Sequence, residues 1–263
     1  MHLLSSMATN LVNSTPLRGF YTKLRATGKR GQSFVELALV LPVLIIMLAG
    51  MTEVAFFVGR YLDALDLTRE AARFASVRLY TATLPSAQYD CSNANAFDFY
   101  YDTSCIFSPP ANSPSCVSAQ FCNGFNPYLT MDLAHDDIVI TAFTTDYNQA
   151  DGKIEVAPNG VHPANGWAFS TNTGNGTDNW KYDCQGNVVT STPYYTAARV
   201  NATLLQSADI TTNKGFVAVE FYYCYHQVLN LPIISNIVPN PARIHVYTVM
   251  PLPSAQPTPT PQS

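Results

Sequence analysis

Charged residues are scarce in this sequence, and the places where they are missing limit the classes of protein to which it can belong. Only 12% of the 263 residues are Asp, Glu, Lys or Arg. The first 31 residues contain no acidic residue, whereas nine of the 14 basic residues and all 18 acidic residues follow them. We expect no nucleic-acid partner, because phosphate contacts require a clustered basic surface and the exterior is acidic.

Motifs of common enzyme classes are also missing. The chain contains no GxSxG, HExxH, Walker loop or GxGxxG. His135-Asp136-Asp137 precedes a β-branched run, where a His-Asp pair is more typical of turn and capping chemistry than of a metal site. The stretch from Asp146 fails as a calcium loop, since its glycine comes one place late and Ala157 stands where Glu is required. We expect no enzyme activity, no cofactor and no metal.

Cysteine is absent from the first 90 residues, and all six cysteines follow them. An even number in an exported region favours disulfides, although six cysteines allow 15 pairings. Proximity suggests Cys91 with Cys105 and Cys116 with Cys122, which leaves Cys184 with Cys224. Zinc is the alternative, but no CxxC pair exists and no His lies at ligand spacing beside a Cys.

The longest apolar run extends from Leu37 to Val58 and contains one charged residue, Glu53. A helix of this length reaches about 33 Å, which covers the hydrocarbon core of a bilayer. No good small-x-small cleavage site follows, so the run predicts a transmembrane helix rather than a signal peptide. The basic leader places the amino terminus in the cytoplasm and the residues after Val58 outside.

The residues just before this run form a more specific pattern. Gly31 ends the basic leader, and Glu36 is the fifth residue after it. This spacing resembles the processing site of type IV prepilins, in which an inner-membrane peptidase cuts after the glycine. The resemblance implies Gln32 as the new amino terminus and a pairing of Glu36 with the α-amino group of a neighbouring subunit. An ordinary interfacial charge ahead of an uncleaved anchor is the alternative.

The next residues resemble the TadE-like family of pilin-related proteins from bacterial Tad (Flp) pilus systems. The family pattern combines a glycine, a V-E-[FL]-A-L-V-L-P segment, an acidic residue near the end of the span and an alanine-rich helix. The matching residues are Gly31, Val35–Pro42, Glu53 and Thr68–Ala75. The resemblance is close over residues 30–76 and weak elsewhere. It implies a pilin-like subunit, with Glu36 as an assembly residue. Glu53 is a second candidate assembly residue, because an intramembrane carboxylate suggests a pairing between subunits. The alternative is that Glu53, near the outer boundary of the span, simply reaches water.

We expect four segments in an α+β, pilin-like arrangement with a long amino-terminal helix and an antiparallel, disulfide-bearing extracytoplasmic domain. They are a basic leader over residues 1–31, disordered over 1–28, then a transmembrane and extended helix over 32–84, a β-rich domain over 85–253, and a Pro/Thr-rich tail over 254–263. The extended helix should carry an apolar stripe at intervals of three and four residues. This stripe comprises Tyr61, Leu65, Thr68, Ala72, Ala75 and Leu79.

Alternation and turn residues predict the elements of the β-rich domain. Residues 86–125 should form an insertion held by disulfides, and residues 158–193 should be loop-rich. A hairpin is expected over 137–144 and 153–157. Three further strands are expected over 195–205, 216–225 and 244–250, with Val217, Val219, Phe221 and Tyr223 on one face of the middle one.

The sequence therefore predicts a TadE-like minor pilin or pseudopilin in the bacterial cytoplasmic membrane. Its expected partners are the membrane, a prepilin peptidase, other pilin subunits and the inner-membrane assembly platform. The alternative is an uncleaved, signal-anchored β domain that acts as an adhesin or carbohydrate-binding module. The 15 tyrosines and two tryptophans leave that alternative open, because exposed aromatic rings suit sugar faces.

Overall fold

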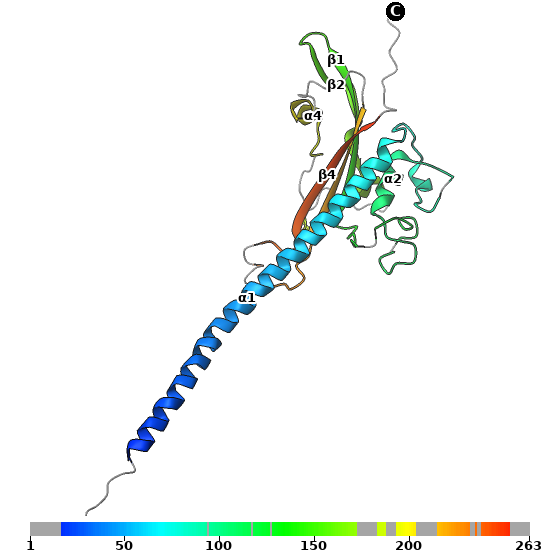
Figure 1. Cartoon of the computed structure of the whole chain (residues 1–263). Coiled ribbons are helices and arrows are strands. Elements are labelled where there is room, and N and C mark those ends of the chain that lie inside the picture. The colour runs from blue at the N-terminus through cyan, green and yellow to red at the C-terminus, as the bar shows by residue number, and fades with distance from the viewer. Residues whose placement is uncertain are drawn as a thin grey trace, which may run out of the picture. The chain divides into compact units, whose positions relative to one another are not determined.

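The contacts of the chain divide it into two units, Met1–Thr52 and Glu53–Ser263. The computed structural model describes residues 17–93, 95–116, 118–126, 128–172, 183–187, 193–203, 215–231, 235 and 238–252. The predicted Pro/Thr-rich tail lies outside the described residues. Helix α1, Leu17–Ser76, contributes residues to both units (Figure 1).

Helix α1 begins earlier and ends earlier than the sequence predicts. The expectation of disorder over residues 1–28 is wrong from Leu17 onward, and residues 1–16 lie outside the described part. The stretch from Leu17 to Arg30 contains several helix-favouring Leu, Lys, Arg and Ala residues and no proline, so a helix nucleated in the apolar run can extend backwards through it. The helix ends at Ser76, nine residues before Pro85, where the Arg78 guanidinium lies over the Phe74 ring.

From Phe34 onward, the helical residues of the first unit are strongly apolar, and their large side chains are exposed. From Phe34 to Met51 the large hydrophobic side chains all keep between 46% and 75% of their surface exposed. One stretch in the helix from Ser33 is long and apolar enough to cross a membrane, and none of it is buried within the chain. Nothing in the described part of the protein covers this surface, as the predicted membrane helix requires.

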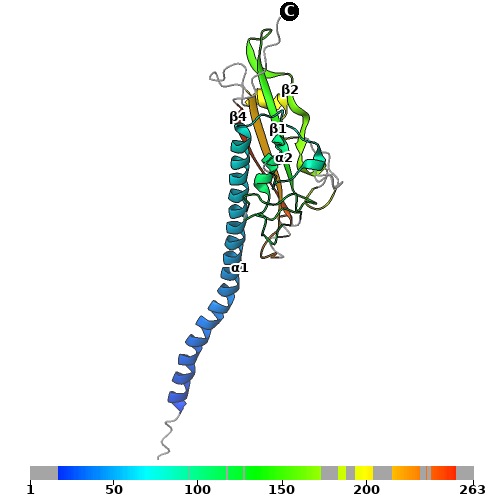
Figure 2. The same ribbon diagram turned by 90° about the vertical axis from the view of Figure 1, so that its right-hand side faces the viewer.

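The second unit is built on a four-stranded antiparallel sheet of order β2-β1-β3-β4. The fold class predicted from the sequence, α+β with a long amino-terminal helix and a disulfide-bearing antiparallel sheet, is confirmed. The strands are β1 Asp137–Asn148, β2 Lys153–Ala168, β3 Gly215–Tyr225 and β4 Ala242–Leu252. In two views related by a quarter turn, the last part of α1 runs along the sheet (Figure 2).

Alternation along β3 sends its side chains to two different cores. Val217, Val219 and Phe221 are fully buried in the larger core, and Tyr223 packs against it, as predicted. Ala218 belongs to a second cluster on the other face, with Phe143, Tyr195 and Val200. Because both faces are covered, β3 is buried through most of its length.

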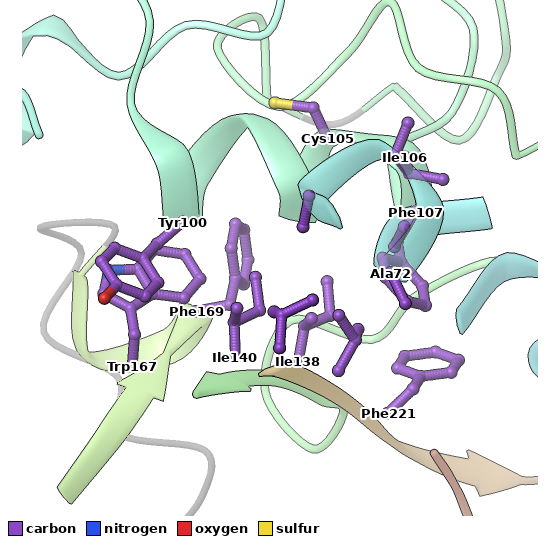
Figure 3. Packing of buried hydrophobic residues seen from close by; sticks show 14 of the residues in the cluster. Ala72, Tyr100, Cys105, Ile106, Phe107, Ile138, Ile140, Trp167, Phe169 and Phe221 are labelled. Carbon is purple, nitrogen blue, oxygen red and sulfur yellow. The ribbon is translucent and has the colours of Figure 1, made fainter. Parts of the chain in front are cut away.

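Small residues on α1 allow the helix to approach the sheet closely. Ala64, Ala71, Ala72 and Ala75 are fully buried, and the Thr68 hydroxyl lies 3.4 Å from that of Thr248 on β4. Ala72 faces the same core as β-strand side chains such as Ile138 and Phe221 (Figure 3). The predicted stripe is therefore confirmed in its middle, whereas Tyr61 and Leu79 at its two ends are exposed.

The insertion after α1 closes the rest of this core. It contains η1 Ser86–Gln88, α2 Phe99–Ser104 and η2 Cys105–Phe107. Asp98 caps α2 by accepting a hydrogen bond from the Tyr101 N–H at 2.7 Å. Phe107 packs against Phe221 with ring centroids 4.9 Å apart. The insertion has few regular elements, in agreement with the sequence prediction.

Two predicted elements are wrong. Residues 158–168 are not a loop, because β2 continues to Ala168. Asn159 and Gly166 adopt positive φ values of 59° and 73°, and the β1–β2 register shifts in two places, so the Asn-Gly pairs are accommodated as irregularities within a strand. Residues 195–205 were expected to form a strand, but residues 197–203 form helix α4, Ala197–Thr203. Thr196 precedes the helix, and its carbonyl and hydroxyl oxygens accept hydrogen bonds from the Val200 and Arg199 N–H groups. α3 is a single turn, Phe169–Asn172.

Candidate functional site

Glu53 is the acidic residue of the apolar run, and the structure buries it at the base of the second unit. Only 5% of its surface is exposed. One carboxylate oxygen accepts hydrogen bonds from the Tyr225 hydroxyl at 2.7 Å and from the Val228 N–H at 2.9 Å. The other oxygen accepts from the Leu229 N–H at 2.8 Å. A carboxylate with three donors at this position ties α1 to the end of β3 and to the chain that follows it.

The alternation of side chains along β3 directs the side chain of Tyr225 toward the Glu53 carboxylate. Tyr225 is the last residue of β3 and shares the face of Val217, Val219 and Phe221. Its ring meets Phe57 of α1 edge to face, with centroids 5.4 Å apart. Burial, and then the hydrogen bond to Glu53, raises the pKa of Tyr225, so its hydroxyl remains a proton donor at physiological pH.

Polar residues of the connection from β3 to β4 form hydrogen bonds with one another. Asn240 accepts a hydrogen bond from the Gln227 N–H at 3.0 Å and donates to the Asn230 side chain at 2.8 Å. The Gln227 side-chain amide donates to the Val238 carbonyl at 3.2 Å. These bonds hold the two ends of the connection together beside Glu53.

An open pocket of about 290 Å³ lies between this connection and α1. Its lining consists of Glu53, Val54, Phe57, Tyr225, Gln227, Val238 and Ala242. Gln227 is 8% exposed, and its amide oxygen has no hydrogen-bond partner among the residues that the structure describes. The walls are otherwise apolar, so the pocket suits an apolar chain rather than a charged ligand.

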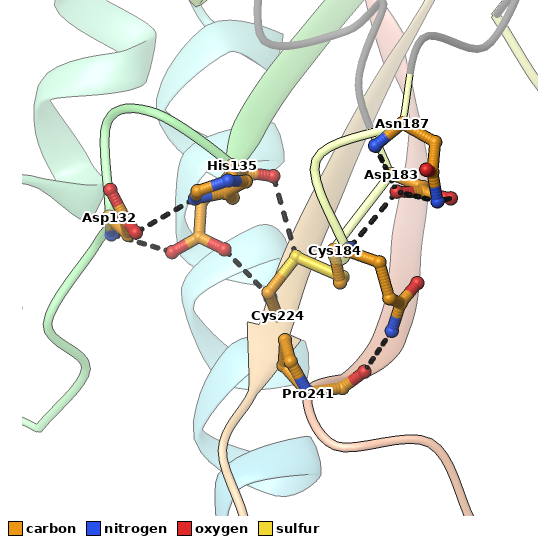
Figure 4. The surroundings of a disulfide bond; sticks show 9 residues. Asp132, His135, Asp183, Cys184, Asn187, Cys224 and Pro241 are labelled. Carbon is orange, nitrogen blue, oxygen red and sulfur yellow. Dashed lines mark hydrogen bonds and ion pairs between the residues drawn. A yellow bond between two sulfur atoms is a disulfide. The ribbon is translucent and has the colours of Figure 1, made fainter.

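The disulfide Cys184–Cys224 forms a second polar site at the end of the sheet (Figure 4). Asp136, the residue immediately before β1, accepts hydrogen bonds from the Cys224 N–H and the Asp132 N–H, both at 2.7 Å. Burial raises the pKa of Asp136 to about 7, despite these two donors. The Asp183 side chain accepts from the Gln185 and Asn187 N–H groups and so shapes the turn that carries Cys184.

The structure contains three disulfides, and they are the pairs that proximity suggests. Cys91 is bonded to Cys105 and Cys116 to Cys122 within the insertion, whereas Cys184–Cys224 ties a turn to β3. No free cysteine remains. Among the residues that the structure describes, no group of three or more His, Cys, Asp or Glu could hold a metal ion.

The predicted processing and assembly residues lie in different units. Gly31 and Glu36 are exposed on α1 in the first unit, and a Cβ added at Gly31 would meet no atom within 4 Å. Gln32 is helical, and its side chain lies outside the described residues. Glu53 begins the second unit, and its carboxylate is occupied by donors of its own chain.

Sequence reasoning missed the partners of Glu53 and a second buried carboxylate. Glu220 is fully buried on the other face of β3 and accepts hydrogen bonds from the Tyr194 N–H, the Tyr195 N–H and the Tyr222 hydroxyl. His245 lies 3.1 Å from the same carboxylate. The available clue was an acidic residue inside the apolar strand sequence FVAVEFYYCY. Its partners are distant in sequence, so no spacing could reveal them.

These features define an α+β protein with a long, exposed apolar helix and a disulfide-bonded sheet domain, in which buried carboxylates accept hydrogen bonds from neighbouring elements. The family model described as TadE-like protein matches residues 31–73. The match covers Gly31, Glu36, Glu53 and the buried alanines of α1 up to Ala72, and it confirms the resemblance over this segment. The search of curated proteins and the search of solved structures each returned no match.

Proposed function

We propose that this chain is a non-enzymatic minor pilin or pseudopilin of a Tad (Flp) pilus or secretion apparatus. The observation that carries the proposal is the TadE-like match over residues 31–73, on a helix whose apolar side chains are exposed. Such a surface requires lipid before assembly and neighbouring subunits after it.

The proposed topology follows from charge. The five basic residues up to Arg30 keep the amino terminus in the cytoplasm, and the sheet domain with its three disulfides lies on the oxidising side. A prepilin peptidase cuts after Gly31, so that Gln32 becomes the first residue and Glu36 the fifth. The inner-membrane assembly platform then draws the subunit into a fibre or uses it to prime one.

Gly31→Ala tests the proposal sharply, because the structure needs no glycine at this position. The residue is exposed, its φ is not positive, and open space surrounds the position of an added Cβ. Alanine is also favoured over glycine inside a helix by about 1 kcal/mol. We expect the variant to fold and insert normally but to keep its leader when the cognate peptidase is present, and to be lost from pili.

Intact mass of the membrane-extracted protein reads out the cleavage. Gly59→Ala is the matched control, since Gly59 also lies within α1 and a Cβ there meets no atom within 4 Å. The control should be processed and assembled as the parent chain is. A parent chain that retains its leader beside an active peptidase would rule out the processing step.

The adhesin alternative has weaker support in the structure. Tyr194 and Tyr247 are about 40% exposed and stack with centroids 5.3 Å apart. However, the Arg199 guanidinium lies 3.7 Å from the centroid of the Tyr194 ring. The ring contacts made within the chain leave less aromatic face for a sugar.

A further inference from the structure

We propose that the connection between β3 and β4 is a second membrane-contacting element, which lies in the outer leaflet beside the transmembrane helix and offers its apolar pocket to a lipid acyl chain. The inference rests on the membrane-anchoring part of the proposed function and is independent of cleavage after Gly31.

The composition of the connection is the first argument. Between Glu220 and Arg243 the chain contains no Asp, Glu, Lys or Arg. Within this stretch, residues 227–242 include seven Val, Leu or Ile residues. Three of them are large side chains that the structure places on the surface: Val228 is 58% exposed, Leu229 40% and Val238 43%. A loop of a water-soluble domain normally carries charge at such positions, whereas a lipid-facing loop excludes it.

The position of the connection is the second argument. Its Val228 and Leu229 N–H groups donate to Glu53. Glu53 lies five residues before the end of the apolar run at Val58, which is about 7 to 8 Å along a helix. If α1 spans the membrane as proposed, the connection is held at the level of the last turns of the span.

At the level of the membrane, the hydrogen bonds of Glu53 stabilise both the carboxylate and the connection. An ionised carboxylate at this depth is costly unless donors surround it. The connection supplies two backbone donors, and Tyr225 supplies the third. At the same time Glu53 satisfies two backbone N–H groups that lipid could not satisfy. The acid and the loop therefore make each other compatible with the bilayer.

The first charged residues of α1 after the apolar run lie near an exposed aromatic residue. Arg60, two turns after Glu53 on α1, donates to the Tyr128 carbonyl and lies 3.8 Å from Asp63. Phe125 and Tyr128 are 74% and 68% exposed. An exposed aromatic residue such as Tyr128 beside the first charge after an apolar run is typical of the interface between membrane and water.

The pocket identifies the part of the lipid that would enter it. Its walls include Val54, Phe57, Val238 and Ala242, and its volume of about 290 Å³ is suited to a segment of hydrocarbon. The amide oxygen of Gln227 is buried, so the pocket presents almost no polar surface to an occupant. We infer an acyl-chain site rather than a site for a soluble ligand.

Tryptophan fluorescence in full-length protein reconstituted at high lipid excess tests this placement. Val228→Trp and Val238→Trp each add a ring at an exposed position of the connection. The vesicles contain phosphatidylethanolamine and phosphatidylglycerol, with acyl chains either unmodified or brominated near the headgroup. The signal of the native Trp167 and Trp180 is measured in the parent chain and subtracted.

Two matched variants serve as controls. Leu44→Trp lies within the predicted span and should be quenched strongly. Tyr147→Trp is 48% exposed near the end of β1, which antiparallel pairing places at the opposite end of the sheet from the connection, and it should not be quenched. Intact disulfides in non-reducing mass measurements show that each variant has folded.

We expect brominated lipid to remove roughly half or more of the fluorescence added at residues 228 and 238, because both rings would lie within reach of the acyl chains. If Leu44→Trp is quenched but the two connection variants behave like Tyr147→Trp, the inference is wrong and the anchoring remains supported. If Leu44→Trp is also unquenched, the anchoring itself fails. Crosslinking between two copies from a photoreactive residue at 238, without quenching, would show that a second copy covers the site and would overturn the lipid assignment.

Discussion

The carboxylate of Glu53 on α1 accepts a 2.7 Å hydrogen bond from the hydroxyl of Tyr225 on β3, 172 residues further along the chain. This contact joins the end of the apolar run to the central strand pair of the sheet domain. The TadE-like match includes Glu53 but ends at residue 73, well before Tyr225. The family segment thus supplies one half of a contact whose other half comes from the sheet domain.

Replacing Glu53 by Gln should loosen the β3–β4 connection. Glutamine keeps one acceptor oxygen but loses the charge, and a hydrogen bond to a charged group contributes about 2 kcal/mol. We expect amide exchange at Val228 and Leu229 to accelerate about 30-fold, which is the same free energy expressed as a rate ratio. Glu70→Gln removes only the exposed 3.0 Å pair with Arg73 and should leave exchange at these amides unchanged. Unaltered exchange in Glu53→Gln would contradict the proposed role of the acid.

Enlarging a buried alanine of α1 should separate the helix from the sheet. Ala72 is fully buried in the core, so Ala72→Leu should lower the free energy of unfolding by about 1 to 3 kcal/mol. Ala55 is exposed on the same helix, and Ala55→Leu should change stability by less than about 0.5 kcal/mol. Denaturant unfolding of the detergent-solubilised proteins compares the two variants. An equal effect of both would show that helix packing on the sheet is looser than described.

The three disulfides should differ in their contribution to stability. The sequence separations are 40 residues for Cys184–Cys224, 14 for Cys91–Cys105 and 6 for Cys116–Cys122. Loop-closure entropy predicts contributions of about 4, 3 and 2 kcal/mol in that order. Paired Cys→Ser variants, compared by thermal unfolding, should lose stability in the same order. A larger loss on removing Cys116–Cys122 than on removing Cys184–Cys224 would argue against the entropic ranking.

Asp136 should make stability depend on pH between about 4 and 7. Its pKa is about 7 in the folded protein, whereas an exposed Asp titrates near 4. In this window the folded state binds the proton more tightly than the unfolded state, so the free energy of unfolding falls as pH rises. Asp136→Asn removes the titration, and the parent chain should lose stability relative to this variant from pH 4 to pH 7. A stability difference that stays constant or runs the other way would refute the assignment.

Glu36→Ala should separate assembly from processing. The side chain is exposed on the first unit, so its loss should leave membrane insertion and cleavage after Gly31 unchanged. If Glu36 pairs with the amino terminus of a neighbouring subunit in an apolar surrounding, its removal should reduce incorporation into pili by about tenfold or more. Quantitative immunoblots of sheared pili measure this ratio, with Glu70→Ala as the control. Normal incorporation of Glu36→Ala would exclude the pairing role.

Local patterns predicted several parts of this protein correctly. The absence of charge from residue 37 to 52 and the alternation in residues 216–225 each depend on neighbours in the chain, so the apolar helix and β3 could be recognised directly. The same patterns failed where tertiary packing decided the outcome. Asn-Gly pairs in β2 were accommodated by irregular pairing with β1, and the 195–205 segment became a helix that packs Val200 against Phe143.

The sequence by itself determined the long apolar helix, the Gly31–Glu36 spacing, the α+β class and the cysteines available for pairing, because these follow from composition and short-range periodicity. Only the tertiary structure decided the role of Glu53. An acid near the end of an apolar helix could equally face lipid, another subunit or its own domain. The three donors that bury it come from residues more than 170 positions away, and only the folded chain brings them together.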